Sequence, residues 1–83
     1  MNNVLVNEAD IRTMFGFRNN QADNGLLRLI LYKAEDRGYI TRQVLGGAAW
    51  YDAEEVLALM NMPYVSSILE RRKAGVAGAN NGR

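Results

Sequence analysis

The feature that most constrains the fold is an amphipathic segment that runs from Leu26 to Arg37. At about 100° per residue, its large apolar side chains gather on one arc of a helix and polar side chains lie opposite. Gly38 ends the segment, and Arg37 stands in the last turn, where the helix dipole favours a cation. We therefore predict a helix with Leu29 on its exposed side and a buried arc formed by Leu26, Leu27, Ile30, Leu31 and Ala34.

The start of this helix is marked by a capping pattern. Asn20 and Asp23 have the spacing of an N-cap residue and a first-turn acid, so the helix begins near Gln21 or later, at Asp23. Gly25 lies close to this boundary and makes its position less definite, because glycine is a poor helix former.

A shorter helix is predicted nearer the N-terminus. Asn7 is a strong N-cap residue, and Asp10 follows three positions later, where an acid suits the helix dipole. The helix is expected over Glu8 to Phe15 and to end at Gly16. The apolar residues 4–6 that precede the cap are expected to form a short strand or an apolar lead-in.

A β-hairpin is expected after the long helix. Residues 39–45 alternate and are rich in β-branched and aromatic side chains, and residues 48–51 return after the pair Gly46-Gly47, which can take positive φ twice.

The aromatic residues of this hairpin are expected to supply core packing. Because neighbouring residues in a strand face opposite sides of the sheet, at least one of Trp50 and Tyr51 should be buried. We expect the same of Tyr39. The other interpretation is a platform on which a base stacks.

Two further helices are predicted. Asp52 and Glu55 have the spacing of a capping box, and the helix that follows has an apolar face. Pro63 stops this helix, and a last helical segment is expected from Tyr64 to Lys73. The apolar face of the first of these helices is formed by Val56, Leu57, Leu59 and Met60.

The composition divides the chain into a domain and a tail. With 83 residues there is room for one small domain, expected over residues 1–73. Residues 74–83 are small and polar and bury too little to offset their ordering entropy, so a flexible tail is predicted.

The composition also limits the chemistry. The chain has no Cys and no His, so the commonest thiol nucleophile, general base and metal ligands are absent. We expect no enzyme activity and no cofactor. Apolar runs such as residues 29–31 are far too short to span a bilayer, and a signal-peptide pattern is not seen, so a cytoplasmic protein is expected.

The order of elements predicts the fold class, a mostly helical α+β domain of the winged helix-turn-helix type. Two helices joined by a polar turn are followed at once by a two-stranded hairpin, the wing. A helix of this kind fits the major groove of DNA, and a hairpin beside it reaches phosphates or the minor groove.

Three stretches carry a resemblance to a known family. They are residues 7–16, a helix that ends in Gly; residues 36–42, which read Asp-Arg-Gly-Tyr-Ile-Thr-Arg; and residues 50–56, which read Trp-Tyr-Asp-Ala-Glu-Glu-Val. Together with Gly46-Gly47 they resemble small winged-helix proteins of phages and mobile elements, the excisionases, and the N-terminal DNA-binding domains of the MerR family. The resemblance covers about residues 4–60.

The resemblance implies a recognition helix at about residues 21–37 and a wing at 40–51. Two departures accompany it. The connection from Gly16 to Gly38 is longer than is usual for the family, and the exposed helix face carries Glu35 and Asp36, which repel phosphates unless they pair with Arg28 or Tyr32 or point away.

The candidate DNA-binding residues lie in three places. At the turn and along the long helix, Asn, Gln and Arg side chains suit base edges, although the same residue types also cap and turn. The wing and the basic end of the last helix could touch phosphates, or be an ordinary hairpin and a solvated helix end. The candidates are Arg18, Asn19, Asn20, Gln21, Asn24, Arg28, Tyr32, Lys33, Arg42, Gln43, Arg71, Arg72 and Lys73.

The first functional hypothesis is a sequence-specific DNA-binding accessory or regulatory protein of a phage or mobile element. Its partner would be double-stranded DNA, with a homodimer or cooperative assembly left open. The formal net charge of +1 keeps a second hypothesis open, a protein-binding module that inhibits or adapts a host protein or a recombinase. A third, the DNA-recognition domain of a small terminase subunit, ranks lower, because such subunits normally carry a long C-terminal assembly segment.

Overall fold

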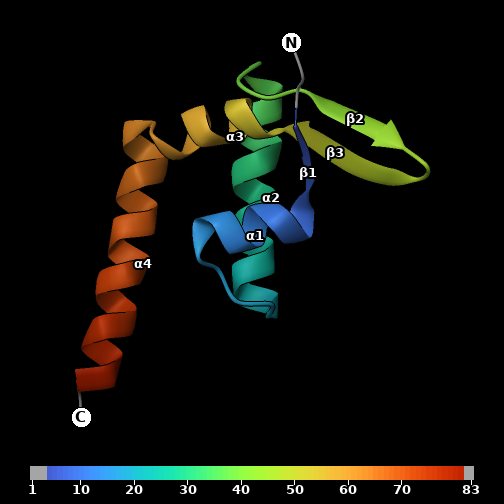
Figure 1. The fold of residues 1–83 in the computed structure, drawn as a ribbon. Coiled ribbons are helices and arrows are strands. Elements are labelled where there is room, and N and C mark those ends of the chain that lie inside the picture. The colour runs from blue at the N-terminus through green and yellow to red at the C-terminus, as the bar shows by residue number, and fades with distance from the viewer. Residues whose placement is uncertain (1–3, 82–83) are drawn as a thin grey trace.

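A three-stranded antiparallel sheet joins the N-terminal strand to the hairpin and is packed on one side of a helical layer (Figure 1). The computed structural model describes the backbone of residues 4–81 and the side chains of residues 4–72. Its elements are β1 (Leu5–Asn7), α1 (Glu8–Phe15), α2 (Gln21–Asp36), β2 (Arg42–Leu45), β3 (Ala48–Asp52), α3 (Ala53–Met60) and α4 (Pro63–Asn81). The predicted mostly helical α+β architecture is confirmed.

Helix α1 is capped at both ends as predicted. The Asn7 side chain accepts a hydrogen bond from the Asp10 backbone N–H at 2.8 Å, and the Asp10 carboxylate accepts one from the Asn7 N–H at 3.0 Å. Gly16 ends the helix with φ 75°, a left-handed conformation that glycine adopts without a Cβ penalty. Strand β1, directly before the cap, pairs with β3 and places α1 against the sheet.

Helix α2 begins at Gln21, the earlier of the two predicted positions. Asn20 caps it, with its side-chain oxygen accepting from the Asp23 N–H at 2.7 Å. The predicted arc faces the core: Leu26 is half-buried and the other members are buried, while Leu29 is exposed. The core around this arc draws on every other helix and contains Ile11, Phe15, Phe17, Ile40, Tyr51, Val56, Leu59 and Val65.

The hairpin forms with the predicted turn. Gly46 and Gly47 have φ of 58° and 82°, the pair of positive values that a two-residue turn of this hand needs. Of the two aromatic neighbours, Tyr51 is buried and Trp50 is half-buried, so the expectation of core packing is confirmed.

The prediction for Tyr39 is wrong, because its side chain is 44% exposed. The strand was expected from residue 39, but β2 begins at Arg42. Gly38 has φ 79°, and the Tyr39 N–H donates to the Ala34 carbonyl at 2.9 Å, so these residues still belong to the turn that closes α2. The chain then buries Ile40 in place of Tyr39.

The start of α3 differs from the predicted capping box. Asp52 caps the helix, but its carboxylate accepts from the Glu54 N–H at 2.8 Å. The Glu55 carboxylate instead accepts from the Thr41 N–H at 2.9 Å, across to the segment before β2.

The apolar face of α3 is also narrower than predicted. Val56 and Leu59 are buried and Met60 is half-buried, whereas Leu57 is 51% exposed. Leu57 lies about 100° from Val56 around the helix and so falls outside the buried stripe.

Helix α4 starts at Pro63, which suits the first position of a helix because its missing N–H would have no partner there. It buries Val65 and half-buries Ile68 and Leu69. The helix continues to Asn81, past the predicted end at Lys73. Helix propensity does not explain this extension, because Gly75 and Gly78 offset the alanines of the stretch. Flexibility of residues 74–83 stays a prediction.

Among the residues searched, no helix combines the length and the apolar character that crossing a membrane requires.

Candidate nucleic-acid interface

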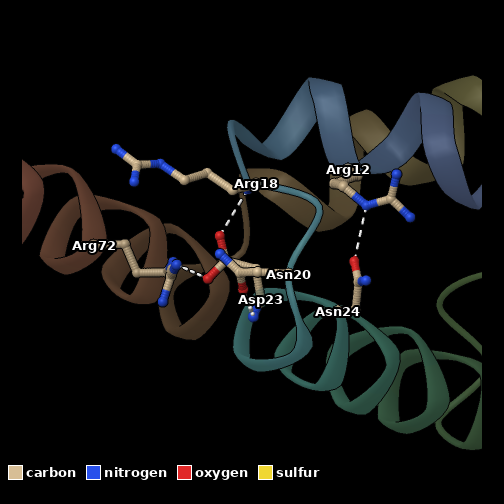
Figure 2. Close-up of polar contacts among 6 residues, drawn as sticks. All are labelled: Arg12, Arg18, Asn20, Asp23, Asn24 and Arg72. Atoms are coloured by element: carbon tan, nitrogen blue, oxygen red, sulfur yellow. Dashed lines mark hydrogen bonds and ion pairs between the residues drawn. The ribbon is translucent and has the colours of Figure 1, made fainter.

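Helices α1 and α2 cross, and polar side chains tie the turn between them. The Arg12 Nε donates to the Asn24 side-chain oxygen at 2.9 Å (Figure 2). The Asn24 amide nitrogen donates to the Asn19 side-chain oxygen at 3.0 Å. Asn20 is engaged as the cap of α2. Three of the candidate asparagines thus stabilise the turn. They therefore have the capping and turn-forming role that was the alternative to base recognition.

One buried carboxylate anchors the same turn. Asp23 is 3% exposed and accepts the Arg18 N–H at 2.7 Å, which joins the chain before α2 to its first turn. Its second oxygen pairs with the Arg72 guanidinium from α4 (Figure 2). The same guanidinium lies 4.8 Å from the centre of the Phe17 ring. This pair couples α4 to the turn between α1 and α2.

The three basic residues expected to form a DNA-binding end therefore differ. Arg72 is half-buried and packs against Asp23 and the Phe17 ring, unlike a solvated helix end. Arg71 is exposed. The side chain of Lys73 lies outside the described residues. Arg18 remains available to a ligand, because its side chain is exposed and points away from Asp23 (Figure 2).

A groove of about 530 Å³ lies between α2 and the hairpin, with the first residue of α1 at its edge; we call it the α2–hairpin groove. Two ion pairs stand in it. Arg28 donates from Nε to Glu8 at 3.0 Å, and Arg42 donates from Nε to Glu35 at 3.3 Å. The groove is lined by Glu8, Arg28, Leu31, Tyr32, Glu35, Asp36, Arg42 and Tyr51.

Both arginines of the groove stay accessible to solvent. The Arg28 side chain is 71% exposed and that of Arg42 is 49% exposed. Each arginine donates to its carboxylate through Nε. A guanidinium carries five N–H donors, so further acceptors can bind. The groove contains two arginines against the carboxylates of Glu8, Glu35 and Asp36, which leaves an excess of one negative charge.

Tyr51 lies at the base of this groove. Burial raises the pKa of its hydroxyl above the ordinary value of 10.0; the charge of Arg42 lowers the pKa, and Glu35 and Glu8 raise it. The hydroxyl therefore stays protonated at neutral pH and can donate a hydrogen bond.

The exposed face of α2 runs beside the groove. Gln21, Tyr32 and Lys33 are exposed, with Tyr32 at 70%. Leu29 lies on the same outer side at 49% exposure. A Cβ added at Gly25 would meet nothing within 4 Å, so another molecule can approach the helix backbone closely there.

The hairpin adds few cations and several apolar atoms. All four residues of β2 are exposed, and Arg42 is the one basic residue between positions 40 and 51. Gln43 is exposed beside it, and Val44 and Leu45 follow at 63% and 49% exposure. The wing therefore offers one cationic contact near its base and an apolar tip.

Two residues of the surface were missed as site residues at the sequence level. Arg12 bridges α1 to Asn24, and Glu8 neutralises Arg28 from twenty positions away. No local spacing signals such contacts, because they arise only when α1 crosses α2. Among the residues searched, no group of three acidic side chains is placed to hold a metal ion.

Comparison with protein-family models, with curated proteins and with solved structures finds no match to this chain.

Proposed function

We propose that this chain is a winged-helix DNA-binding protein that inserts α2 into the major groove and lays the β2–β3 hairpin on the adjacent backbone. The element order β1-α1-α2-β2-β3-α3 supports this, with β1 closing the sheet beside the hairpin. In Figure 1 the hairpin projects away from α4 and leaves one side of α2 uncovered.

The observation that carries the proposal is a pair of accessible arginines on the uncovered face of α2 and the neighbouring strand, although each is paired with a carboxylate. Arg28 lies along the helix and Arg42 stands on the neighbouring strand, both with accessible side chains. Arg18 is also exposed, but it lines a separate groove beside α4. A major groove about 12 Å wide admits a helix, and flanking arginines then reach phosphates on either side.

Base contacts would come from the outer face of α2. Gln21 suits adenine and is exposed at the helix N-terminus. Tyr32 and Lys33 follow further along the helix, where α2 would approach the DNA backbone at the edge of the major groove. Asn19 and Asn24 first have to leave their mutual hydrogen bond, so we assign them to shaping the turn.

The biological role that fits such a domain is accessory or regulatory. The proposed mode uses binding alone, and a small domain of this kind acts by bending DNA or by occupying a promoter. The resemblance to excisionases and MerR-type domains supports a phage or mobile-element origin for that role.

A gel-shift assay over a salt series tests the proposal. Arg28→Ala and Arg42→Ala should each weaken binding at low salt and reduce the salt dependence by about one phosphate contact. Arg37→Ala is the matched control, since Arg37 is also exposed at the end of α2 but does not line the groove. Unchanged affinity for both groove variants at about 50 mM salt would reject DNA binding through this face.

A second candidate, a protein-binding module, is favoured by one feature, the apolar hairpin tip beside a groove with excess negative charge. A partner such as a recombinase or host protein would cover Val44 and Leu45. In this case Val44→Ser with Leu45→Ser should abolish capture of the partner from nuclease-treated lysate, and the wild-type protein should not bind DNA at about 50 mM salt.

A further inference from the structure

We propose that Glu8 and Glu35 are affinity-limiting residues of the DNA-binding surface: each holds one arginine of the α2–hairpin groove and competes with DNA phosphate for it. This inference rests on the proposed DNA-binding function. In this role the two carboxylates weaken binding to DNA that the protein contacts only at its phosphates.

The first argument is the placement of the two ion pairs. Glu8 reaches Arg28 from α1 at 3.0 Å, and Glu35 reaches Arg42 from α2 at 3.3 Å. Both arginines of the groove therefore have a carboxylate in contact, and both pairs face the same opening. A phosphate that enters this opening meets each arginine already neutralised.

The second argument is that these pairs are exposed enough to exchange. The side chains of Glu8 and Glu35 are 34% and 36% exposed. Exposed ion pairs are weak, so a phosphate can displace the carboxylate at modest cost. The contrast is the pair of Arg72 with Asp23, whose carboxylate side is 4% exposed and which packs inside the domain.

The third argument concerns binding to random-sequence DNA. Such binding depends almost wholly on phosphate neutralisation and on release of counterions. Carboxylates that cancel two arginines reduce this contribution directly. A domain arranged in this way depends more on its contacts with bases and on DNA shape.

The experiment uses the full chain and a random-sequence duplex of about 20 base pairs as the probe. Glu8→Gln and Glu35→Gln keep the side-chain shape and remove the charge. Each should tighten binding by about threefold to fivefold at 50 mM salt, the range set by an exposed ion pair, and make the salt dependence steeper.

Glu54→Gln is the matched control. Glu54 and Glu8 are both first-turn acids, so the two substitutions change the net charge and the helix-dipole contribution alike. Glu54 is exposed on α3 and does not line the groove. Its substitution should change the affinity by much less than that of Glu8.

A double-mutant cycle separates holding of the arginine from plain repulsion of phosphate. In an Arg28→Ala background, Glu8→Gln should lose most of its effect if Glu8 acts through Arg28. An undiminished effect of Glu8→Gln in that background would overturn the inference, and so would equal effects of Glu8→Gln and Glu54→Gln. If the wild-type protein still binds DNA in these cases, the proposed function stands. Failure of the wild type and of every variant to bind would reject both.

Discussion

Replacing Asp23 tests how the turn between α1 and α2 is held. The Asp23 carboxylate accepts the Arg18 N–H at 2.7 Å and pairs with Arg72, and it is 3% exposed. Asp23→Ala removes both contacts at once. It leaves the Arg18 N–H without this acceptor and Arg72 over the Phe17 ring without its counter-charge.

The magnitude follows from these two contacts. A hydrogen bond to a charged acceptor contributes about 1.5–3 kcal/mol. Breaking a buried ion pair costs about 3–5 kcal/mol, but the Arg72 side chain is 35% exposed, so solvent reduces that cost considerably. We expect Asp23→Ala to lower the free energy of unfolding by about 2–3 kcal/mol. For a domain of this size, each kcal/mol corresponds to about 4–8 °C in Tm.

Urea denaturation followed by circular dichroism measures this change, with a thermal melt as the second readout. Asp23→Asn retains an acceptor for the Arg18 N–H and should be milder, and the cycle with Arg72→Ala isolates the ion pair. A loss below about 0.5 kcal/mol for Asp23→Ala, the range of ordinary surface substitutions, would refute the reasoning.

Two other predictions follow from single residues. Gly25→Ala should stabilise the protein by about 0.5–1 kcal/mol, because Gly25 lies inside α2 with open space around it. Gly47→Ala should destabilise the protein, because φ at Gly47 is 82°. Equal effects of the two substitutions on the free energy of unfolding in urea would contradict this. Because the folded pKa of Tyr51 is raised above 10.0, its stabilising contribution is complete below pH 10 and is lost as pH rises through the folded pKa. Absorbance titration should show one tyrosine ionising late, and Tyr51→Phe should remove that late step; loss of a step at the ordinary tyrosine pKa of 10.0 instead would be evidence against the burial argument.

Local signals predicted the elements that local physics determines. Asn7 and Asn20 cap helices where their side chains were expected to, and the turn at Gly46-Gly47 has the expected positive φ. Such features depend on neighbours within a few residues, so a sequence can show them. The buried arc of α2 was found for the same reason, since helical periodicity is local.

The errors occur where tertiary contacts decide. Glu55 has capping-box spacing but bonds to Thr41, fourteen positions away, once the hairpin brings that segment to α3. Tyr39 was expected inside, but the turn that ends α2 presents Ile40 to the core instead. Leu57 is apolar and yet exposed because the buried stripe of α3 is narrow.

In the candidate site, too, the sequence predicted local features but not tertiary contacts. Residue type and element order pointed to the exposed Arg28, Tyr32 and Arg42 beside α2. Pairing of Glu35 or Asp36 with Arg28 was one expected alternative, but Glu35 pairs with Arg42 and Arg28 pairs with Glu8. The partner of Arg72 lies 49 positions away on α2. Contacts of such separation depend on how helices cross.

Amide chemical shifts on titration with a 20-base-pair duplex at about 50 mM salt test the central claim most directly. The account predicts that the perturbed amides gather at the turn, along the outer face of α2 and in the hairpin, within residues 18–32 and 42–48. It also predicts that these changes reverse as salt is raised. Perturbations confined to α3 and α4, or a spectrum unchanged by DNA, would contradict it.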